Sequence, residues 1–554
     1  MATHDSTHSP AALSIGQYLI QRLQDYGIGH VFGIPGDYVL TFYGMLEKSA
    51  IKTVGCTRED NAGFAADAYA RVNGMGAVCV TYCVGGLSVC NSIAGAFAEK
   101  SPVVVISGSP GMSERDNNPL LHHKVREFHT QMDVFEKLCI AGAELHDPAT
   151  AFREIDRVLD AASRFKRPVY LELPRDMVEV VPQTSPPFSK VEVASDPQAM
   201  SEACDDAVAM LAKAQKPIIL AGVEVHRFGL QDQLVELAER SNIPIAATLL
   251  GKSVVRETHP LYVGIYEGAM GREEVTRFVE ESDCVLLLGA FMTDINLGIY
   301  TADLNPNKCI YATSEQLRIR HHHFHGVQLG DFMQSLTEKL PPTTREIPPG
   351  VRQKTRPFEL KAEAPITISR MIALLNDRME EDTIVIADIG DSLFSATDLI
   401  IQGRTEFISP AYYTSMGFST PAALGAHFAR PDGRPLVICG DGAFQMTGQE
   451  FSTMVRHKIP AVMIILDNHG YGTERFLHPG DWEYNEILPW NYSKLPEVYG
   501  GGRGYQAATE GEFAQAMASA WDDLSGPSLI QVKIGVEDSS QALIRLAERL
   551  SKRV

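Results

Sequence analysis

The sequence predicts an α/β protein made of three doubly wound domains, each built on a mainly parallel sheet. Short apolar runs recur along the 554-residue chain, most of them are separated by stretches with helical periodicity, and two polar, proline-bearing stretches interrupt this rhythm. Parallel strands are buried on both faces and therefore read as continuous apolar runs, whereas the helices that cover them have one apolar face. A chain of this length also exceeds what one hydrophobic core can organise.

The expected elements follow in chain order. The apolar runs that predict strands are 76–82, 101–108, 167–173, 216–223, 283–290, 382–388, 434–440, 460–466 and 527–534. The polar stretches 181–198 and 341–365 are typical of linkers, because they are rich in proline and poor in apolar residues. We therefore expect an N-terminal domain at 1–185, a central domain at 195–345 and a C-terminal domain at 365–554.

Composition excludes several classes of function. A net charge of -20 and a pI near 5.3 oppose nucleic-acid binding, which needs a basic face. The nine cysteines form no CxxC pair and are typical of reduced thiols. The N-terminal residues lack the pattern of a signal peptide, and no apolar run approaches the ~20 residues that span a bilayer. We expect a cytoplasmic protein that has neither a nucleic-acid nor a membrane partner.

Two strand ends carry the chemistry of a phosphate and metal site. Gly440, Asp441 and Gly442 lie at the end of one apolar run and precede a predicted helix, where glycines admit a ligand close to the backbone. Asn468 follows the next run, 27 residues after Asp441. Adjacent parallel strands carry both side chains to the same sheet edge. With the Gly470 carbonyl they would supply half the oxygen shell of Mg²⁺, leaving positions for water and a diphosphate. The alternative is two unrelated polar turns.

The spacing of GDG and N-x-G resembles the diphosphate-binding motif of thiamine-diphosphate enzymes. Four further motifs are similar to the non-oxidative 2-keto acid decarboxylases, which act on pyruvate, indolepyruvate, phenylpyruvate or branched-chain keto acids: FGIPGDYVL at 32–40, REDNAGFAADAYAR at 58–71, LLHH at 120–123 and GYGTE at 470–474. The resemblance covers nearly the whole chain. It implies the thiamine-diphosphate-binding fold, thiamine diphosphate and Mg²⁺ as cofactors, and decarboxylation of a 2-keto acid to an aldehyde and CO₂ through an enamine on the cofactor.

The resemblance also implies catalytic roles. Glu59 matches the glutamate that bonds the aminopyrimidine ring and promotes deprotonation of the thiazolium; the alternative is a glutamate favoured at a helix N-terminus. Asp37, His122, His123 and Glu474 match the acid–base groups around the reacting carbon. Taken singly, Asp37 is also explained as a turn or N-cap residue, and the two histidines as surface or core residues.

Further positions match residues that bind the cofactor. Met416 matches the bulky apolar residue that holds the cofactor bent, although an ordinary core methionine explains it too. The family often has threonine where this chain has Asp391. The resemblance therefore implies that Asp391 contacts the diphosphate through its backbone. The implied metal ligands are Asp441, Asn468 and Gly470. The implied cofactor-binding set is Glu59, Asp391, Thr414, Ser415, Met416, Asp441, Gly442, Ala443, Asn468, Gly470, Tyr471, Gly472 and Thr473.

The expected substrate is a small 2-keto acid with an aromatic or branched side chain, such as phenylpyruvate or indolepyruvate. Gly472 and Thr473 stand where the pyruvate enzymes carry larger branched residues, and smaller side chains leave room for a larger substrate. The alternatives are a pyruvate decarboxylase, a carboligase of the acetolactate synthase type, and a Mg²⁺-dependent phosphate-binding protein, against which the Glu59 motif argues. The resemblance implies a homo-oligomer, a dimer or tetramer, with active sites between subunits.

Overall fold

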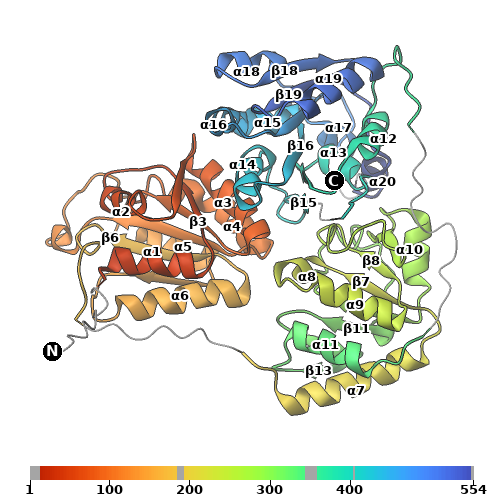
Figure 1. The fold of residues 1–554 in the computed structure, drawn as a ribbon, viewed down its shortest axis with the longest axis horizontal. Helices are drawn as coiled ribbons and strands as arrows, with labels where there is room; N and C mark the ends of the chain where they lie inside the picture. The colour runs from red at the N-terminus through yellow and green to blue at the C-terminus, as the bar shows by residue number, and fades with distance from the viewer. Residues whose placement is uncertain (1–12, 184–192, 344–357, 404–405, 551–554) are drawn as a thin grey trace, which may run out of the picture. The chain divides into compact units, whose positions relative to one another are not determined.

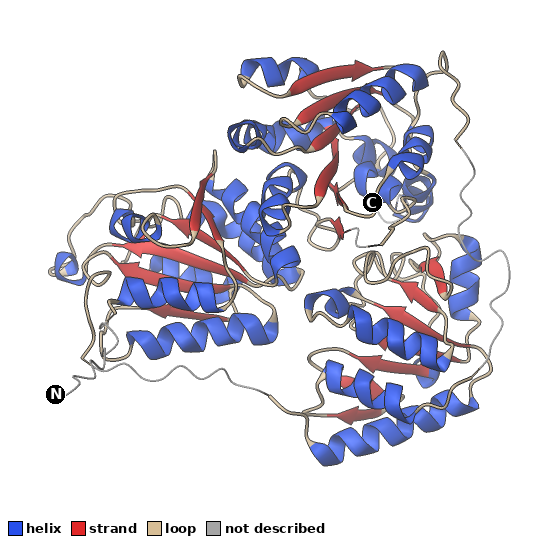
Figure 2. Ribbon diagram, viewed as in Figure 1, coloured by secondary structure: helices blue, strands red, loops and turns tan. Residues whose placement is uncertain are grey.

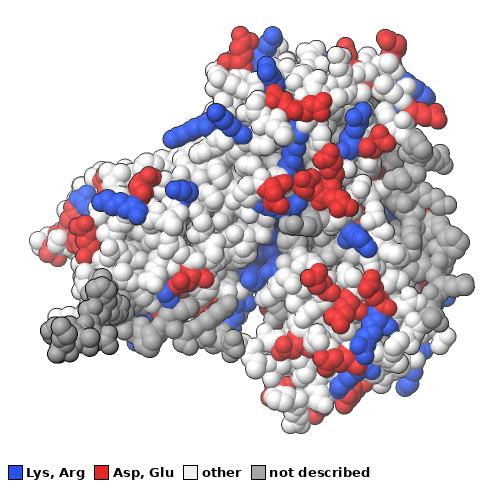
Figure 3. Space-filling view, in the orientation of Figure 1, with Lys and Arg blue, Asp and Glu red and all other residues white. Residues whose placement is uncertain are grey.

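The computed structural model describes residues 13–183, 193–343, 358–403 and 406–550. The chain divides into two compact units, 1–191 and 192–554. The first unit contains one sheet and the second contains two (Figures 1 and 2). The face drawn in Figure 3 carries acidic and basic side chains that are interspersed rather than gathered by sign.

The sheet of the first unit is parallel throughout, in the order β2-β1-β3-β4-β6-β5. Its strands are β1 (His30–Gly33), β2 (Lys52–Gly55), β3 (Gly76–Val80), β4 (Val103–Ser109), β5 (Ala141–Glu144) and β6 (Val169–Pro174). Its helices are α1 (Ile15–Asp25), α2 (Leu40–Leu46), α3 (Glu59–Asn73), α4 (Cys90–Ala98), α5 (Thr130–Leu138) and α6 (Ala151–Phe165). All residues of β3, β4 and β6 are buried, as central parallel strands require.

The first sheet of the second unit has the order β13-β12-β11-β10-β7-β8-β9. Its strands are β7 (Pro217–Ala221), β8 (Ile245–Ala247), β9 (Tyr262–Ile265), β10 (Cys284–Leu288), β11 (Cys309–Ala312), β12 (Leu317–Ile319) and β13 (His322–Phe324). The pairs β11–β12 and β12–β13 are antiparallel, and the others are parallel. The helices are α7 (Pro197–Lys213), α8 (Val223–Arg227), α9 (Gln231–Ser241), α10 (Glu273–Glu280) and α11 (Leu329–Lys339).

The other sheet of this unit is parallel, in the order β15-β14-β16-β17-β19-β18. Its strands are β14 (Thr383–Ala387), β15 (Glu406–Ile408), β16 (Arg434–Gly440), β17 (Val462–Asp467), β18 (Arg503–Ala507) and β19 (Ser528–Lys533). Its helices are α12 (Ile368–Arg378), α13 (Asp391–Ala396), α14 (Ser419–Ala429), α15 (Asp441–Thr447), α16 (Phe451–His457), α17 (Gly472–Leu477), α18 (Leu495–Val498), α19 (Glu510–Asp522) and α20 (Gln541–Leu550). Gly440 pairs with Leu466, so the ends of β16 and β17 lie side by side.

The predicted fold class is confirmed, because the sheets are mainly parallel and each of the nine apolar runs overlaps a strand. The antiparallel strands β12 and β13 were not predicted. The domain boundaries stay a prediction, and the expected linkers include 184–192 and 344–357, which lie outside the described residues. Within the described ranges, no helix combines the length and apolar character needed to cross a bilayer.

Candidate active site

The carboxyl edge of the sheet that contains β16 and β17 opens into a cavity of about 340 Å³. Most of the predicted cofactor residues of this unit line it, and Ser415 is not among the residues that do. The predicted residues that line the cavity are Asp391, Thr414, Met416, Asp441, Gly442, Ala443, Asn468, Gly470, Tyr471, Gly472, Thr473 and Glu474. Parallel strand order explains this gathering, since the loops after neighbouring strands converge at one edge.

Asp441 directly follows β16 and begins α15, and its buried carboxylate accepts backbone hydrogen bonds. The Gly442 nitrogen donates to Oδ1 at 2.7 Å, and the Gly470 nitrogen donates to Oδ2 at 3.2 Å. Burial, together with the charge of Asp467, raises the pKa of Asp441 to about 6. An ionised carboxylate in such a place is costly unless a positive charge accompanies it.

Asp467 adds a second buried acid at the end of β17. Its Oδ2 accepts a hydrogen bond of 2.7 Å from Gln531, whereas its Oδ1 is buried and has no hydrogen-bond partner among the described residues. Two buried carboxyl groups with an unmet acceptor favour a nearby cation. Asp441, Asn468 and Gly470 line the cavity and carry oxygen atoms of the type that Mg²⁺ prefers. The residues therefore fit a magnesium ion.

Glycines shape the adjoining surface for close approach by a ligand. A Cβ on Gly442 would lie 2.6 Å from the Tyr471 ring, and a Cβ on Gly470 would lie 1.9 Å from the Asn485 carbonyl oxygen. Gly470 also has a φ of 151°, which disfavours other residues. The backbone of this loop can thus approach a diphosphate without intervening side chains.

Arg475 holds this loop in shape, a role that sequence reasoning missed. Its Nη1 donates to the Asn468 carbonyl at 3.0 Å, and its Nη2 donates to the His469 carbonyl at 2.9 Å. The same guanidinium pairs with Glu486 at 2.9 Å. His469 has a left-handed φ of 63°, so the loop needs such external support. The only signal in the sequence is a cation a few residues beyond the turn.

Asp391 begins α13 and directs its carboxylate toward the C-terminal helix. Ser540 donates to it from both the backbone nitrogen, at 2.9 Å, and Oγ. Burial raises the pKa of Asp391 to about 6. A diphosphate contact from Asp391 stays a prediction. The helix α20 that follows Ser540 also lines the cavity, through Leu546.

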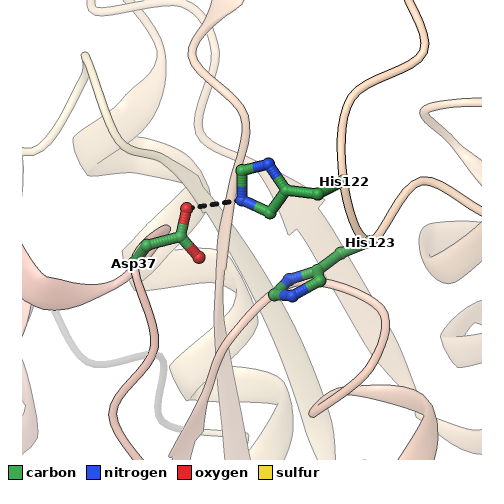
Figure 4. A group of neighbouring side chains, drawn as sticks. All are labelled: Asp37, His122 and His123. Atoms are coloured by element: carbon green, nitrogen blue, oxygen red, sulfur yellow. Dashed lines mark hydrogen bonds and ion pairs between the residues drawn. The ribbon is translucent and has the colours of Figure 1, made fainter.

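A second group of predicted residues lies in the first unit. Asp37 follows β1, and His122 and His123 lie in the loop after β4; the Asp37 Oδ2 and His122 Nε2 atoms are 2.7 Å apart (Figure 4). One ligand atom from each of the three residues lies within 4.8 Å of the others. Asp37 and His122 are exposed, whereas Nδ1 of His123 is buried and has no hydrogen-bond partner in the described part of the chain. A carboxylate paired with imidazoles can accept, hold and return protons.

Two residues that sequence reasoning missed support this group. The buried Tyr38 ring stacks on His122 at 4.8 Å and meets His123 edge-on at 5.8 Å. Arg175 lies over the Tyr38 ring, and its Nη1 is 3.8 Å from the Asp37 carboxylate. Glu114 accepts a hydrogen bond of 2.7 Å from Arg175 Nε and fixes the guanidinium. The role of Tyr38 could have been predicted because Tyr38 directly follows Asp37 in sequence. No residue near Arg175 in sequence indicates that Arg175 contacts Asp37.

Glu59 and Glu474 complete the predicted catalytic residues. Glu59 is the half-buried first residue of α3 and follows β2, which neighbours β1 in the sheet. Glu474 is exposed in α17 and lines the cavity described above. Glu59, Asp37 and the histidines therefore belong to the first unit, and Glu474 belongs to the second with the diphosphate residues.

Three family models match successive segments of the chain. Residues 13–136 match the family model of the thiamine pyrophosphate enzyme N-terminal TPP binding domain, 204–340 match the central domain, and 388–532 match the C-terminal TPP binding domain. The chain is 36% identical to an indole-3-pyruvate decarboxylase of Azospirillum brasilense, over 97% of this chain and 98% of that protein. It is 31% identical to pyruvate decarboxylase isozyme 1 of Saccharomyces cerevisiae, over 97% and 98% of the two chains. It is also 31% identical to an alpha-keto-acid decarboxylase of Mycolicibacterium paratuberculosis, over 100% and 99%.

Proposed function

Because the chain belongs to the family of thiamine-diphosphate-dependent 2-keto acid decarboxylases, we propose that its substrate is an aromatic or branched 2-keto acid, such as phenylpyruvate or indolepyruvate. Family membership makes the protein a lyase that uses thiamine diphosphate with a divalent metal, typically Mg²⁺. The products of the proposed reaction are CO₂ and the corresponding aldehyde.

The observation that carries the substrate proposal is the small size of the side chains beside Glu474. Gly472 and Thr473 both line the cavity, and a Cβ on Gly472 would meet only the side chain of Asn468 within 4 Å. Each methylene group that a pocket gains or loses changes discrimination by about 1 to 3 kcal/mol. The similarity to a relative named for indole-3-pyruvate supports the same choice.

The proposed roles follow from the chemistry of the groups. Asp441, Asn468 and the Gly470 carbonyl hold Mg²⁺ and through it the diphosphate, and Met416 packs against the cofactor. When bound, thiamine diphosphate supplies the electron sink for decarboxylation. Glu59 holds a proton at the aminopyrimidine ring. Asp37, His122, His123 and Glu474 hold and deliver protons at the reacting carbon.

We also propose a cytoplasmic homo-oligomer, a dimer or tetramer whose active sites lie between subunits. Apolar side chains near the two groups of site residues are exposed in the single chain, including Leu120 at 97% and Leu488 at 77%, and an interface would cover them. All nine cysteines are free thiols, which supports a reducing compartment. Light scattering on the purified protein tests the assembly, and a monomer at working concentration would argue against it.

The substrate proposal is tested by comparing kcat/KM for indolepyruvate, phenylpyruvate, a branched keto acid and pyruvate. We expect the aromatic acids to exceed pyruvate by about tenfold or more, which corresponds to about 1.4 kcal/mol. A Thr473→Ile variant should lose activity on aromatic acids and keep activity on pyruvate. A preference of the native enzyme for pyruvate would instead support a pyruvate decarboxylase, and acyloin without free aldehyde would support a carboligase.

A further inference from the structure

A second cavity, of about 290 Å³, lies within the unit 192–554 and has no part in the proposed reaction. Its walls come from β9 and the loop that follows it, from the chain after α13, and from α20. Apolar side chains line part of it, including Val263 and Ile400. Five charged side chains also line it: Glu257, Glu267, Arg272, Asp398 and Arg545.

Buried hydrogen bonds fix one wall of this cavity. The buried Lys252 Nζ donates to the Leu399 carbonyl at 2.7 Å and to the Glu257 carboxylate at 2.8 Å. Glu257 also accepts a hydrogen bond of 2.9 Å from the Ile401 nitrogen. Glu257 lines the cavity, but its charge is already balanced by Lys252. The cavity is therefore a formed part of the fold.

Glu267 is the group that points to a ligand. Only 3% of this residue is exposed, and its Oε1 has no hydrogen-bond partner among the described residues. Burial raises the pKa of Glu267 to about 7, even though the charge of Arg545 lowers this pKa. A buried carboxyl oxygen without a partner costs free energy that a bound donor would recover.

Charges of both signs restrict what the cavity accepts. A simple anion would be repelled by Glu267 and Asp398, and a simple cation by Arg272 and Arg545. Within the described ranges, the only cluster of three His, Cys, Asp or Glu side chains placed to share a metal is Asp37 with His122 and His123, so these carboxylates do not form one. A molecule that carries both charges avoids both repulsions.

We propose that this cavity binds a small zwitterion of the α-amino acid class, whose ammonium group donates to Glu267 and whose carboxylate pairs with Arg545. Its side chain lies against Val263 and Ile400. Asp398 and Arg272 complement the same two charges at the cavity wall.

The helix α20 connects this cavity with the one that contains Asp441. Arg545 lines the zwitterion cavity and donates to the Met270 carbonyl at 2.6 Å, whereas the next residue, Leu546, lines the other cavity. The helices α13 and α20 also lie side by side (Figure 1). A ligand bound in the zwitterion cavity would therefore contact α20, which forms part of the wall of both cavities.

Calorimetric titration of the holoenzyme with L-phenylalanine tests the proposal. Phenethylamine keeps the ammonium group without the carboxylate, and 3-phenylpropionate keeps the carboxylate without the ammonium group. We expect one saturable site per chain for L-phenylalanine and at least about tenfold weaker binding of each analogue, because each leaves one buried charge unpaired. Absence of saturable binding, or equal binding of either analogue, overturns the proposal.

Two variants locate the binding. Glu267→Gln keeps the shape of the side chain and removes its charge, so it should weaken L-phenylalanine binding about tenfold or more. Glu273→Gln removes an exposed carboxylate on α10 and should leave the affinity unchanged. If Glu267→Gln does not fold, as judged by thermal melting, Arg545→Gln takes its place. Undiminished binding by the folded variant places the ligand elsewhere and contradicts the proposal.

Discussion

The carboxylate of Asp391 accepts hydrogen bonds from both the backbone nitrogen and Oγ of Ser540, and so joins the first residue of α13 to the residue before α20. Ser540 Oγ in turn accepts a hydrogen bond of 3.1 Å from the Leu543 nitrogen inside α20. A single carboxyl group at the edge of the diphosphate cavity thus fixes the start of the C-terminal helix, whose Leu546 lines that cavity.

Replacing Ser540 should loosen this helix. Ser540→Ala removes a hydrogen bond to a carboxylate and a helix cap, which together contribute about 2 to 4 kcal/mol. We expect faster amide exchange over 541–550 and weaker binding of thiamine diphosphate. Ser525→Ala is the matched control, since Ser525 Oγ bonds the Asp523 carboxylate at 2.6 Å on the surface. Equal exchange in the two variants would show that the Asp391–Ser540 contact does not hold α20.

The pKa of Asp391 predicts a pH dependence of stability. Its pKa is raised by burial from 3.8 to about 6, so between these values the folded state binds more protons than the unfolded state. Stability therefore falls as pH rises through this window, and the cost is complete above pH 6. In Asp391→Asn this contribution is absent. The free energy of unfolding in urea should therefore fall with rising pH in the native protein relative to the variant. A difference between the two proteins that stays constant across the window would contradict this account.

Gly442 should tolerate no side chain. A Cβ at this position lies 2.6 Å from the Tyr471 ring, so Gly442→Ala must displace a residue that lines the cavity. Overpacking of this kind costs about 1 to 3 kcal/mol, and we expect thiamine diphosphate affinity to fall by about tenfold or more. Gly44→Ala, where a Cβ meets nothing within 4 Å, serves as the control. Equal thiamine diphosphate affinity in both variants would show that Gly442 is not part of the cofactor-binding surface.

The Asp37–His122 pair should matter for turnover rather than for cofactor binding. Asp37→Asn removes the proton acceptor 2.7 Å from His122 Nε2. Loss of an acid–base group costs about 10² to 10⁴ in rate, so we expect a fall in kcat of that order with unchanged thiamine diphosphate affinity. Asp25→Asn changes a surface carboxylate of the same unit and should leave kcat unaltered. A native kcat in Asp37→Asn would exclude the pair from catalysis.

The features of the fold and of the candidate site that could be predicted from the sequence are those that depend on local residue patterns and on strand order. Buried parallel strands are recognisable as apolar runs, and neighbouring strand ends explain why Asp441 and Asn468 line the same cavity. The strand β13, with exposed His322 and His323, lacks such a run and was not predicted. The Asp391–Ser540 and Arg175–Asp37 contacts join residues distant in sequence, so no local pattern signals them.

The central claim is that this chain decarboxylates a 2-keto acid with thiamine diphosphate and Mg²⁺, and that Glu59 is required. The most direct measurement is CO₂ and aldehyde release from phenylpyruvate by protein stripped of cofactor and metal, then reconstituted, in native form and as Glu59→Gln. We predict no turnover without both additions, equal amounts of the two products after reconstitution, and loss of turnover in Glu59→Gln with thiamine diphosphate still bound. Decarboxylation by the stripped protein, or full activity in Glu59→Gln, would contradict the account.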